Sequence, residues 1–299
     1  MQAATERGII VINSPDGNTI AATEHTFAMM LAVSRNIPQA NQIMHVGGWD
    51  RKKFVGVELR NKTLAIIGLG KIGTGVAKRA QAFDMNVIAY DPFVSAERAK
   101  ILGVRLLELD ELFKVADFIT VHMPLTNTTR NMIALPQMKT MKPTVRLINC
   151  ARGGIINVAD LATALQDKLI AGAAIDVYEN EPLAEDSPLR TLPNIILTPH
   201  LGASTVEAQI GVSVDVARGI IDALNNRPVA TAVNLPHIPR HILEQLAPYL
   251  DLGERLGRTV TGMSTTILLL YDIKGSQFGQ DDIQQPTTLQ IHKASGRRG

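Results

Sequence analysis

The stretch Gly68-Leu69-Gly70-Lys71-Ile72-Gly73 decides the fold of this chain. A short apolar run over residues 64–67 precedes it, and apolar residues recur at helical spacing over residues 72–83. A second apolar run over residues 87–90 follows and ends at Asp91. This order of strand, glycine turn, helix, strand and acidic residue is typical of a unit that binds a dinucleotide.

Each glycine of this motif has its own expected role. Gly68 permits the tight turn, Gly70 lets the backbone approach a pyrophosphate, and Gly73 lets the helix pack closely on the strand. The helix N-terminus then offers unpaired N–H groups and a positive dipole end to the phosphates. A carboxylate at Asp91 accepts hydrogen bonds from ribose hydroxyls and repels a 2′-phosphate, and Pro92 rather than an arginine follows it. The sequence therefore predicts NAD rather than NADP as the cofactor.

Length and composition indicate a globular protein. The chain has 299 residues, of which 45% are hydrophobic and 19% charged, and its net charge is +2. This length suits about two domains, and the dispersed charge gives no reason to expect nucleic acid or an acidic membrane as a partner. The single cysteine, Cys150, excludes an intrachain disulfide and suits a reducing compartment. Because we find neither an apolar leader nor a membrane-length apolar segment, we expect a cytoplasmic protein.

Strand-like and helical patterns alternate through the middle of the chain and predict an α/β fold with a doubly wound parallel sheet. The expected strands cover residues 64–67, 87–90, 118–121, 145–149, 173–177 and 195–198. Several of these runs are continuously apolar, as expected where helices cover both faces of the sheet. Long helices are expected over residues 18–34 and 204–224, with Asn18 and Ser204 as their N-caps.

The two ends of the chain differ from this middle part. Residues 8–12 read as a buried strand, although almost nothing that could pair with it precedes it. Residues 266–273 form one strongly apolar strand-like run near the other end. One strand does not make a domain, so we expect the chain to be clipped at both ends.

Three polar residues follow predicted strands on the carboxyl side of the sheet, where parallel sheets place their sites. They are Arg152, Glu181 and His200. Taken singly, each has an ordinary alternative, namely a solvated charge, a loop residue and a turn residue. In one sheet that binds a dinucleotide, the three together make a sensible set for hydride transfer.

The chain resembles the D-isomer-specific 2-hydroxyacid dehydrogenases over roughly residues 1–235. The segments that carry the resemblance are residues 68–73, 147–154, 176–182 and 199–205. Residues 49–54 and 207–209 point to the branch that oxidises D-3-phosphoglycerate to 3-phosphohydroxypyruvate, the first step of serine biosynthesis. Two alternatives stay open: a relative that acts on glyoxylate, lactate or another small 2-hydroxy acid, and an NAD-binding fragment without activity.

The resemblance implies a role for each residue of the catalytic set. Arg152 would hold the substrate carboxylate and keto oxygen, and His200 would be the general base that takes the hydroxyl proton. Glu181 would hydrogen-bond His200, fix its tautomer and stabilise the imidazolium. Asp176 would contact the nicotinamide side of the cofactor. Arg51 would be a ligand of the substrate phosphate, and members of this family pair through the nucleotide domain, which implies a homodimer or a larger homo-oligomer.

The motif and the resemblance together assign a set of positions to NAD binding. These are Gly68, Gly70, Lys71, Ile72, Gly73, Asp91, His122, Met123, Pro124, Cys150, Ala151, Asp176 and Gly202. Cys150 is expected to be a packing residue rather than a nucleophile, His122 a spectator beside the cofactor, and His25 structural. We find no cluster of His, Cys, Asp and Glu with metal-ligand spacing in the sequence and expect no metal.

The resemblance also divides the chain into parts. Residues 1–13 would be a remnant of a flavodoxin-like substrate lobe, and residues 14–202 the NAD-binding Rossmann domain. Residues 203–234 would form a helix that returns to the substrate lobe, and residues 235–299 a partial regulatory domain of α+β type. Most of the substrate lobe would then be absent, so we expect the catalytic set to lack part of what closes over the substrate.

Overall fold

The computed structural model describes most of the chain, in two compact units. The described residues are 1–225, 227, 229, 231–235, 242, 248–249, 252–253, 255–256, 270–271 and 289–290. One unit is Pro15–Val212, and the other joins Met1–Ser14 to Ser213–Gly299. The predicted dinucleotide-binding motif and the predicted catalytic set all lie in the unit Pro15–Val212.

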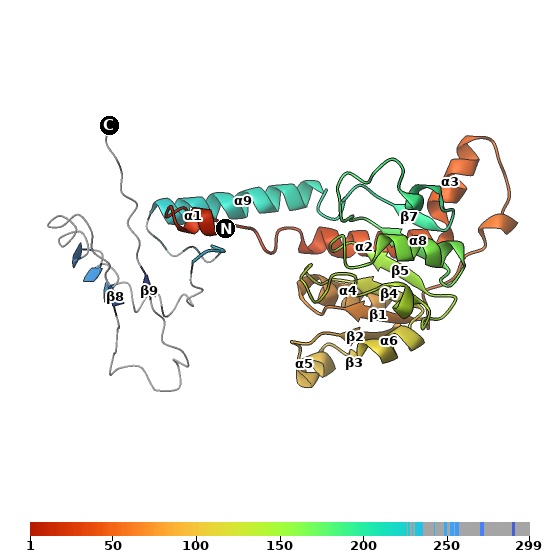
Figure 1. Cartoon of the computed structure of the whole chain (residues 1–299), viewed down its shortest axis with the longest axis horizontal. Coiled ribbons are helices and arrows are strands. Elements are labelled where there is room, and N and C mark those ends of the chain that lie inside the picture. Colours follow the sequence, from red (N-terminus) through yellow and green to blue (C-terminus); the bar gives the residue numbers. More distant parts are fainter. Residues whose placement is uncertain are drawn as a thin grey trace. The chain divides into compact units, whose positions relative to one another are not determined.

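The unit Pro15–Val212 is built on a parallel sheet of seven strands in the order β3-β2-β1-β4-β5-β6-β7 (Figure 1). The strands are β1 (Thr63–Ile67), β2 (Asn86–Tyr90), β3 (Arg105–Leu106), β4 (Phe118–Val121), β5 (Arg146–Asn149), β6 (Gly172–Ile175) and β7 (Ile195–Leu197). This is the predicted doubly wound fold, and the six expected strands are confirmed to within two residues. The chain reverses its direction of winding between β1 and β4, which is where such sheets bind their ligands.

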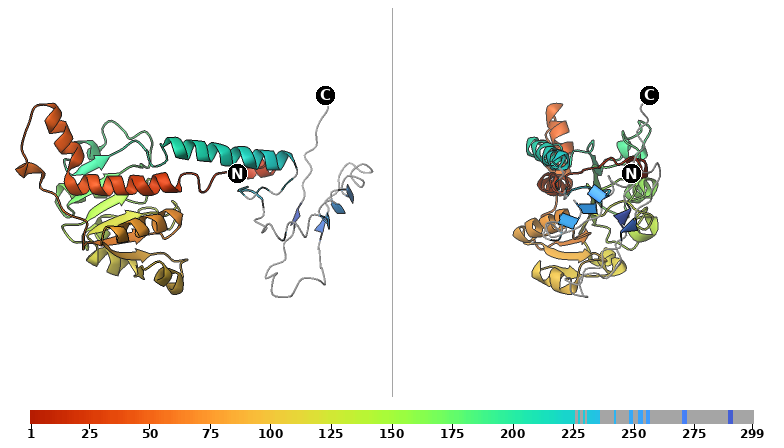
Figure 2. Two further views of the ribbon diagram at one scale, coloured as in Figure 1. Left: turned by 180° about the vertical axis from the view of Figure 1, so that it is seen from behind. Right: turned by 90° about the vertical axis from the view of Figure 1, so that its left-hand side faces the viewer.

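Helices cover both faces of the sheet (Figure 2). The helices between residues 19 and 166 are α2 (Thr19–Arg35), α3 (Ile37–His45), α4 (Lys71–Ala82), α5 (Ala96–Ile101), α6 (Leu109–Val115), α7 (Leu135–Met138) and α8 (Val158–Gln166), with short 3₁₀ turns η1 (Lys52–Phe54) and η2 (Pro188–Thr191). Of these, α3 projects away from the sheet and contacts α2 (Figure 1). Side chains alternate across each strand, so Ile66 packs in the core with Met30 of α2, whereas Ile67 packs in the core with Phe113 of α6. Two apolar cores, one on each face, explain the continuously apolar strands.

The predicted helices form, but their caps differ from expectation. Asn18 precedes α2 as predicted, yet its side chain makes no capping hydrogen bond. The later helix, α9 (Val206–Leu224), begins two residues after Ser204. Its cap is Thr205, whose hydroxyl accepts a hydrogen bond from the Ala208 N–H at 3.1 Å. The prediction of Ser204 as the cap is therefore wrong by one residue.

The expected buried strand at residues 8–12 does not form. Ile9 is 54% exposed and Ile10 37% exposed, and the segment makes one isolated antiparallel bridge, between Ile12 and Ala232. An apolar run is buried only where neighbouring strands pair with it, and here one short bridge meets it. A short helix, α1 (Gln2–Thr5), precedes the segment.

The expected strand at residues 266–273 lies mostly outside the described residues. Its two described residues form β8 (Leu270–Tyr271), which pairs antiparallel with β9 (Leu289–Gln290). Among the helices that the structure describes, none combines the length and the apolar character that crossing a membrane would require.

The glycine turn between β1 and α4 has the close packing that the motif predicts. Gly68 has a φ of +100°, and a Cβ added at Gly73 would lie 2.0 Å from the Gly68 carbonyl oxygen. At Gly70, in contrast, an added Cβ would meet nothing within 4 Å. Gly73 thus serves the fold, whereas Gly70 leaves open space beside the turn.

We predict that the change Gly73→Ala destabilises the protein because its methyl group would displace the backbone of the turn. The free energy of unfolding, measured by urea denaturation, should fall by about 2 kcal/mol or more. The change Gly70→Ala is the matched control and should cost less than about 0.5 kcal/mol. Equal stability of Gly73→Ala and the wild type would contradict the packing described here.

Candidate active site

Asp91 ties the end of β2 to the glycine turn. Its Oδ2 accepts a hydrogen bond from the Leu69 N–H at 2.7 Å, and its Oδ1 accepts one from the Phe93 N–H at 2.9 Å. Each carboxylate oxygen can accept a further bond, so hydroxyls of a ribose could still be recognised here. The turn is open above Gly70 and α4 begins at Lys71, whose ammonium pairs with Asp16. These residues fit a dinucleotide phosphate at the helix N-terminus.

The loop after β4 lies beside this turn. The His122 N–H donates to the Ile67 carbonyl at 2.8 Å, which continues the pairing of β4 with β1. The ring Nε2 of His122 lies 3.0 Å from the Thr120 hydroxyl oxygen. Burial lowers the pKa of His122 to about 4, so the ring is neutral near pH 7. Met123 and Pro124 follow in the same loop, where the prediction placed them.

The loop after β5 presents Arg152. Asn149 is buried, and its side chain accepts from the Ala151 N–H at 3.0 Å and donates to the Arg152 carbonyl at 2.9 Å. A Cβ added at Gly153 would lie 1.9 Å from the Tyr178 carbonyl carbon, so this loop packs directly on the loop after β6. The Arg152 guanidinium is exposed and donates to the Ala151 carbonyl at 2.6 Å. No role for Asn149 is expected from the sequence, although an amide side chain at the end of a strand is a signal for such a bracing hydrogen bond.

Glu181 and His200 meet at the same edge of the sheet. His200 Nδ1 lies 2.7 Å from Glu181 Oε2, and Glu181 Oε1 accepts from the Tyr178 N–H at 3.0 Å. The hydrogen bond with His200, followed by the one from Tyr178, holds the pKa of Glu181 below its usual value. An ionised Glu181 fixes the proton of neutral His200 on Nδ1, so Nε2 is free to accept another proton. The predicted pair is thus formed.

Asp176, which directly follows β6, is completely buried. Its Oδ1 accepts from the Thr198 hydroxyl at 2.6 Å and the Leu201 N–H at 2.8 Å, and its Oδ2 accepts from the Gly202 N–H at 2.9 Å. Burial raises the pKa of Asp176, but hydrogen bonds from His25, Thr198 and Leu201 outweigh this and hold the pKa below its usual value. The carboxylate is therefore ionised and has acceptor capacity left on Oδ2.

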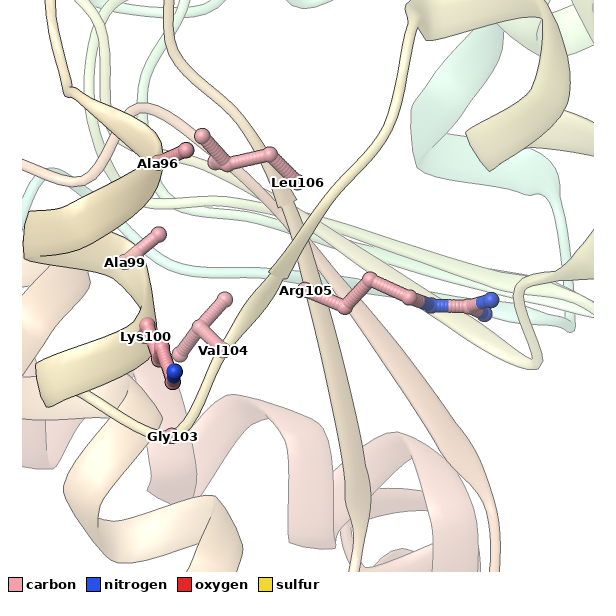
Figure 3. Close-up of a pocket in the computed structure, with 7 residues that line it drawn as sticks. All are labelled: Ala96, Ala99, Lys100, Gly103, Val104, Arg105 and Leu106. Carbon is pink, nitrogen blue, oxygen red and sulfur yellow. The ribbon is translucent and has the colours of Figure 1, made fainter.

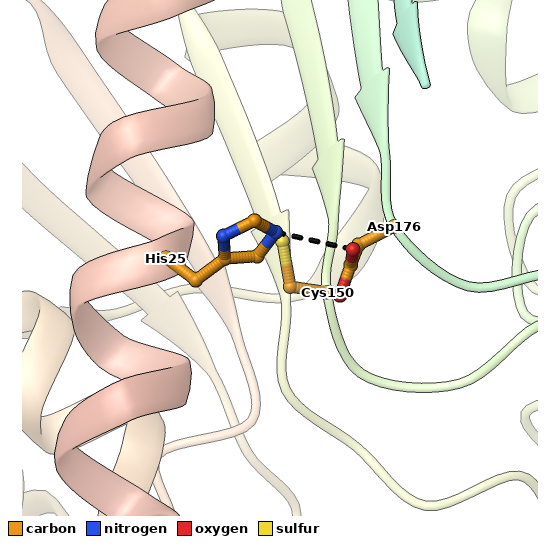
Figure 4. A group of neighbouring side chains, drawn as sticks. All are labelled: His25, Cys150 and Asp176. Carbon is orange, nitrogen blue, oxygen red and sulfur yellow. Dashed lines mark ion pairs between the residues drawn. The ribbon is translucent and has the colours of Figure 1, made fainter. Parts of the chain in front are cut away.

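His25, Cys150 and Asp176 form one cluster from three different elements (Figure 4). Their nitrogen, sulfur and oxygen atoms all lie within 4.8 Å of one another, which is close enough to consider a metal ion. Burial and the charge of Asp176 raise the pKa of the Cys150 thiol to about 12, so the thiol is protonated near pH 7. A metal ion would need the thiolate and would displace the hydrogen bonds that Asp176 accepts. The three side chains are therefore better suited to hydrogen bonding than to metal binding.

Two further features lie away from this edge. A cavity against the edge strand β3 is lined by residues of α5 and β3, and it includes none of the predicted site residues (Figure 3). Its lining residues are Ala96, Ala99, Lys100, Gly103, Val104, Arg105 and Leu106. Arg51 is exposed at the start of η1, and within the described residues its side chain has no ion pair with the carboxyl-edge residues. Of the other predicted site residues, Lys71, Ile72 and Gly73 lie in the first turn of α4, and the rest lie on the turns and loops that follow the strands.

Comparison with protein-family models identifies the nucleotide-binding part of the chain. Residues 27–202 match the model described as D-isomer specific 2-hydroxyacid dehydrogenase, NAD binding domain. The D-3-phosphoglycerate dehydrogenase of Synechocystis is 54% identical over 258 residues, which are 86% of this chain and 46% of that protein. The D-3-phosphoglycerate dehydrogenase of Archaeoglobus fulgidus is 49% identical, over 86% of this chain and 49% of that protein. The chain therefore spans about half the length of the curated relatives that it matches.

Solved structures show the same fold. The TT0316 protein from Thermus thermophilus has a TM-score of 0.73 at 33% identity, and the match covers 78% of this chain and 74% of that one. A D-lactate dehydrogenase with NAD⁺ from Lactobacillus jensenii has a TM-score of 0.70 at 28% identity, covering 78% and 74% of the two chains. These similarities confirm the predicted Rossmann fold.

We predict that neutral His122 makes the fold sensitive to mild acid. Between pH 6.5 and about 4 the unfolded chain binds a proton at this histidine that the folded chain does not bind, so stability falls as the pH drops through that range. From pH 7 to pH 4.5 the free energy of unfolding should fall by about 2–3 kcal/mol more in the wild type than in His122→Gln, as measured by urea denaturation at each pH. The change His45→Gln, at an exposed ring, should leave the loss unaltered. Identical pH dependence of His122→Gln and the wild type would contradict this reading.

Proposed function

The chain belongs to the D-isomer specific 2-hydroxyacid dehydrogenase family, and we propose that it carries the NAD-binding and catalytic part of a D-3-phosphoglycerate dehydrogenase. The reaction would be the reversible, NAD-dependent oxidation of D-3-phosphoglycerate to 3-phosphohydroxypyruvate, which opens serine biosynthesis. The observation that supports this most is the 2.7 Å contact between His200 and Glu181 at the carboxyl edge of the sheet. The identity to D-3-phosphoglycerate dehydrogenases supports the choice of substrate.

The geometry suits His200 to act as the general base. When bound, NAD supplies the group that accepts a hydride from the carbon bearing the substrate hydroxyl. Glu181 holds the Nδ1 proton of His200, so Nε2 can take the proton of that hydroxyl. The resulting imidazolium is stabilised by the Glu181 carboxylate, which stays ionised because its pKa is lowered. In the reverse direction the same Nε2 returns the proton to the keto oxygen.

Arg152 would bind the acid group of the substrate. One of its N–H groups donates to the Ala151 carbonyl, and the exposed guanidinium has further donors for a carboxylate and the neighbouring keto oxygen. Asn149 braces the loop on which Arg152 stands. Asp176 Oδ2 accepts one hydrogen bond from Gly202 and is buried, so a further hydrogen bond from the carboxamide of the cofactor would require residues 201–202 to shift. These two contacts would hold the reacting carbons of substrate and cofactor near His200.

A second copy of the chain would pair through the excursion that follows α2. This excursion, residues 37–55, comprises α3, η1 and the loop segments beside them, and several of its large apolar side chains are exposed. Met44 is 52% exposed, Val46 and Trp49 77% each, and Val55 79%. Side chains of this kind gathered on one excursion are typical of an interface. Arg51 on the same excursion would then supply a ligand for the phosphate of a substrate in the partner's site, and we place the assembly in the cytoplasm.

We predict that removing the base stops turnover without removing the cofactor. His200→Asn should lower kcat/KM for D-3-phosphoglycerate by about 10²–10⁴-fold, measured as formation of NADH by the full chain. Its dissociation constant for NADH should stay within about threefold of the wild type, because His200 is assigned no contact with the cofactor. His45→Asn is the control for loss of an imidazole. Full turnover by His200→Asn would exclude the assigned mechanism. If the wild-type chain bound NAD but showed no turnover, the chain would instead be a cofactor-binding fragment.

We predict that Asp91 sets the preference for NAD. In Asp91→Asn the repulsion of a 2′-phosphate is lost, so the ratio of the dissociation constants for NADPH and NADH should fall by about tenfold or more. The exposed Asp84, which pairs with Arg60, provides the control Asp84→Asn, and the ratio should not change there. Fluorescence titration of the reduced cofactors gives both constants. An unaltered ratio in Asp91→Asn would show that another group discriminates between them.

A further inference from the structure

Helix α2 brings a histidine to the buried carboxylate of the site. His25 lies near the middle of α2, which packs against β5, β6 and β7. Its Nε2 is 3.1 Å from Asp176 Oδ1, and Figure 4 shows the ring directed from the helix toward that carboxylate. The side chain of His25 is 17% exposed, whereas that of Asp176 is 0% exposed. An otherwise structural helix thus makes a polar contact at the carboxyl edge of the sheet.

Asp176 in turn holds the segment on which His200 stands. The Asp176 carbonyl accepts from the His200 N–H at 2.9 Å, and its carboxylate accepts from the N–H groups of Leu201 and Gly202. His200 has a φ of +56°, a left-handed conformation that a non-glycine residue adopts only where its surroundings impose it. Three successive N–H groups on one aspartate supply that constraint.

The position of the Asp176 carboxylate depends on its donors. A buried carboxylate is costly unless hydrogen bonds compensate for the water that it has lost. The Thr198 hydroxyl gives its one proton to Oδ1 at 2.6 Å, so it has none left to donate to the imidazole, which lies 3.4 Å away. Since Oδ1 can only accept, the Nε2 of His25 must carry a proton for the 3.1 Å contact to be favourable. His25 is therefore in position to be the donor that completes the set around Oδ1.

We propose that His25 is a positioning residue, which donates from Nε2 to Asp176 and so keeps residues 200–202 in the conformation that presents His200. Within the described part of the chain no hydrogen bond or ion pair joins the imidazole to His200 or Glu181, so it acts on the loop through the carboxylate. The proposal rests on the proposed function only in treating His200 as the base. Its tests read the loop and the ring themselves, so failure of turnover and failure of this proposal are separate results.

The first test compares two replacements of His25 in the full chain. Gln places an amide Nε2 donor where the imidazole Nε2 stands, whereas Leu fills similar space without a donor. Amide hydrogen exchange of Leu201 and Gly202, followed by NMR, should quicken by about tenfold or more in His25→Leu and stay within about threefold of the wild type in His25→Gln. The matched control is Met29→Leu. Met29 lies one turn further along α2, and its sulfur is 3.7 Å from the Thr198 hydroxyl oxygen.

Each other outcome of this comparison overturns the proposal. Unaltered exchange in His25→Leu would show that the loop does not depend on His25. Equally fast exchange in His25→Gln and His25→Leu would show that the donor is not what matters. Faster exchange in Met29→Leu would assign the effect to packing of α2 in general.

A second test needs no substitution and therefore applies even if His25→Leu does not fold. In the wild-type protein labelled with ¹⁵N at histidine, the nitrogen shifts near neutral pH should show Nε2 of His25 protonated. A ring protonated on Nδ1 alone could not donate to Asp176 and would overturn the proposal. The same spectrum with EDTA should be unchanged, and a change would indicate a metal ion on the cluster of His25, Cys150 and Asp176 instead.

Discussion

The buried carboxylate of Asp176 is the interaction on which the rest of the site depends. It has no exposed surface, and donors from α2 and from the segment after β7 compensate its charge. Because an ionised group in such a place is stable only with those donors, the ends of β6 and β7 and the middle of α2 have to meet at one point. Beside this meeting point, His200 has a left-handed backbone conformation, and its ring contacts Glu181. His200, the proposed base, is thus positioned by the fold rather than by a free loop.

The other loops of the site reach the same edge through similar constraints. Asn149 braces the loop of Arg152, and the close approach of Gly153 to Tyr178 joins that loop to the one bearing Glu181. Asp91 ties the glycine turn to the end of β2. Each of these polar or glycine residues lies at or just after the carboxyl end of a strand, so the sheet fixes its position. The result is a row of short loops at the carboxyl edge that fits a dinucleotide beside the arginine and the histidine proposed to bind and deprotonate the substrate.

Continuously apolar runs and the glycine motif are enough to predict six strands, their parallel arrangement and the edge proposed to bear the site. The strand β3 was missed because two residues, Arg105 and Leu106, leave no apolar pattern. The prediction of a buried strand at residues 8–12 is wrong, because burial of an apolar run depends on neighbouring strands that the run itself does not reveal. The Glu181–His200 pair followed from the family resemblance. The contact of His25 with Asp176 joins residues far apart in the chain, so the helical pattern gave no signal for it.

Hydrogen exchange of the full chain with and without NAD, followed by mass spectrometry, tests whether the carboxyl edge of the sheet is an NAD site. We expect slower exchange with NAD in the loops at residues 68–73, 122–124, 150–153 and 199–202, and unchanged exchange across the cavity lined by residues 96–106. Slower exchange confined to that cavity, or unaltered exchange throughout under saturating NAD, would contradict it.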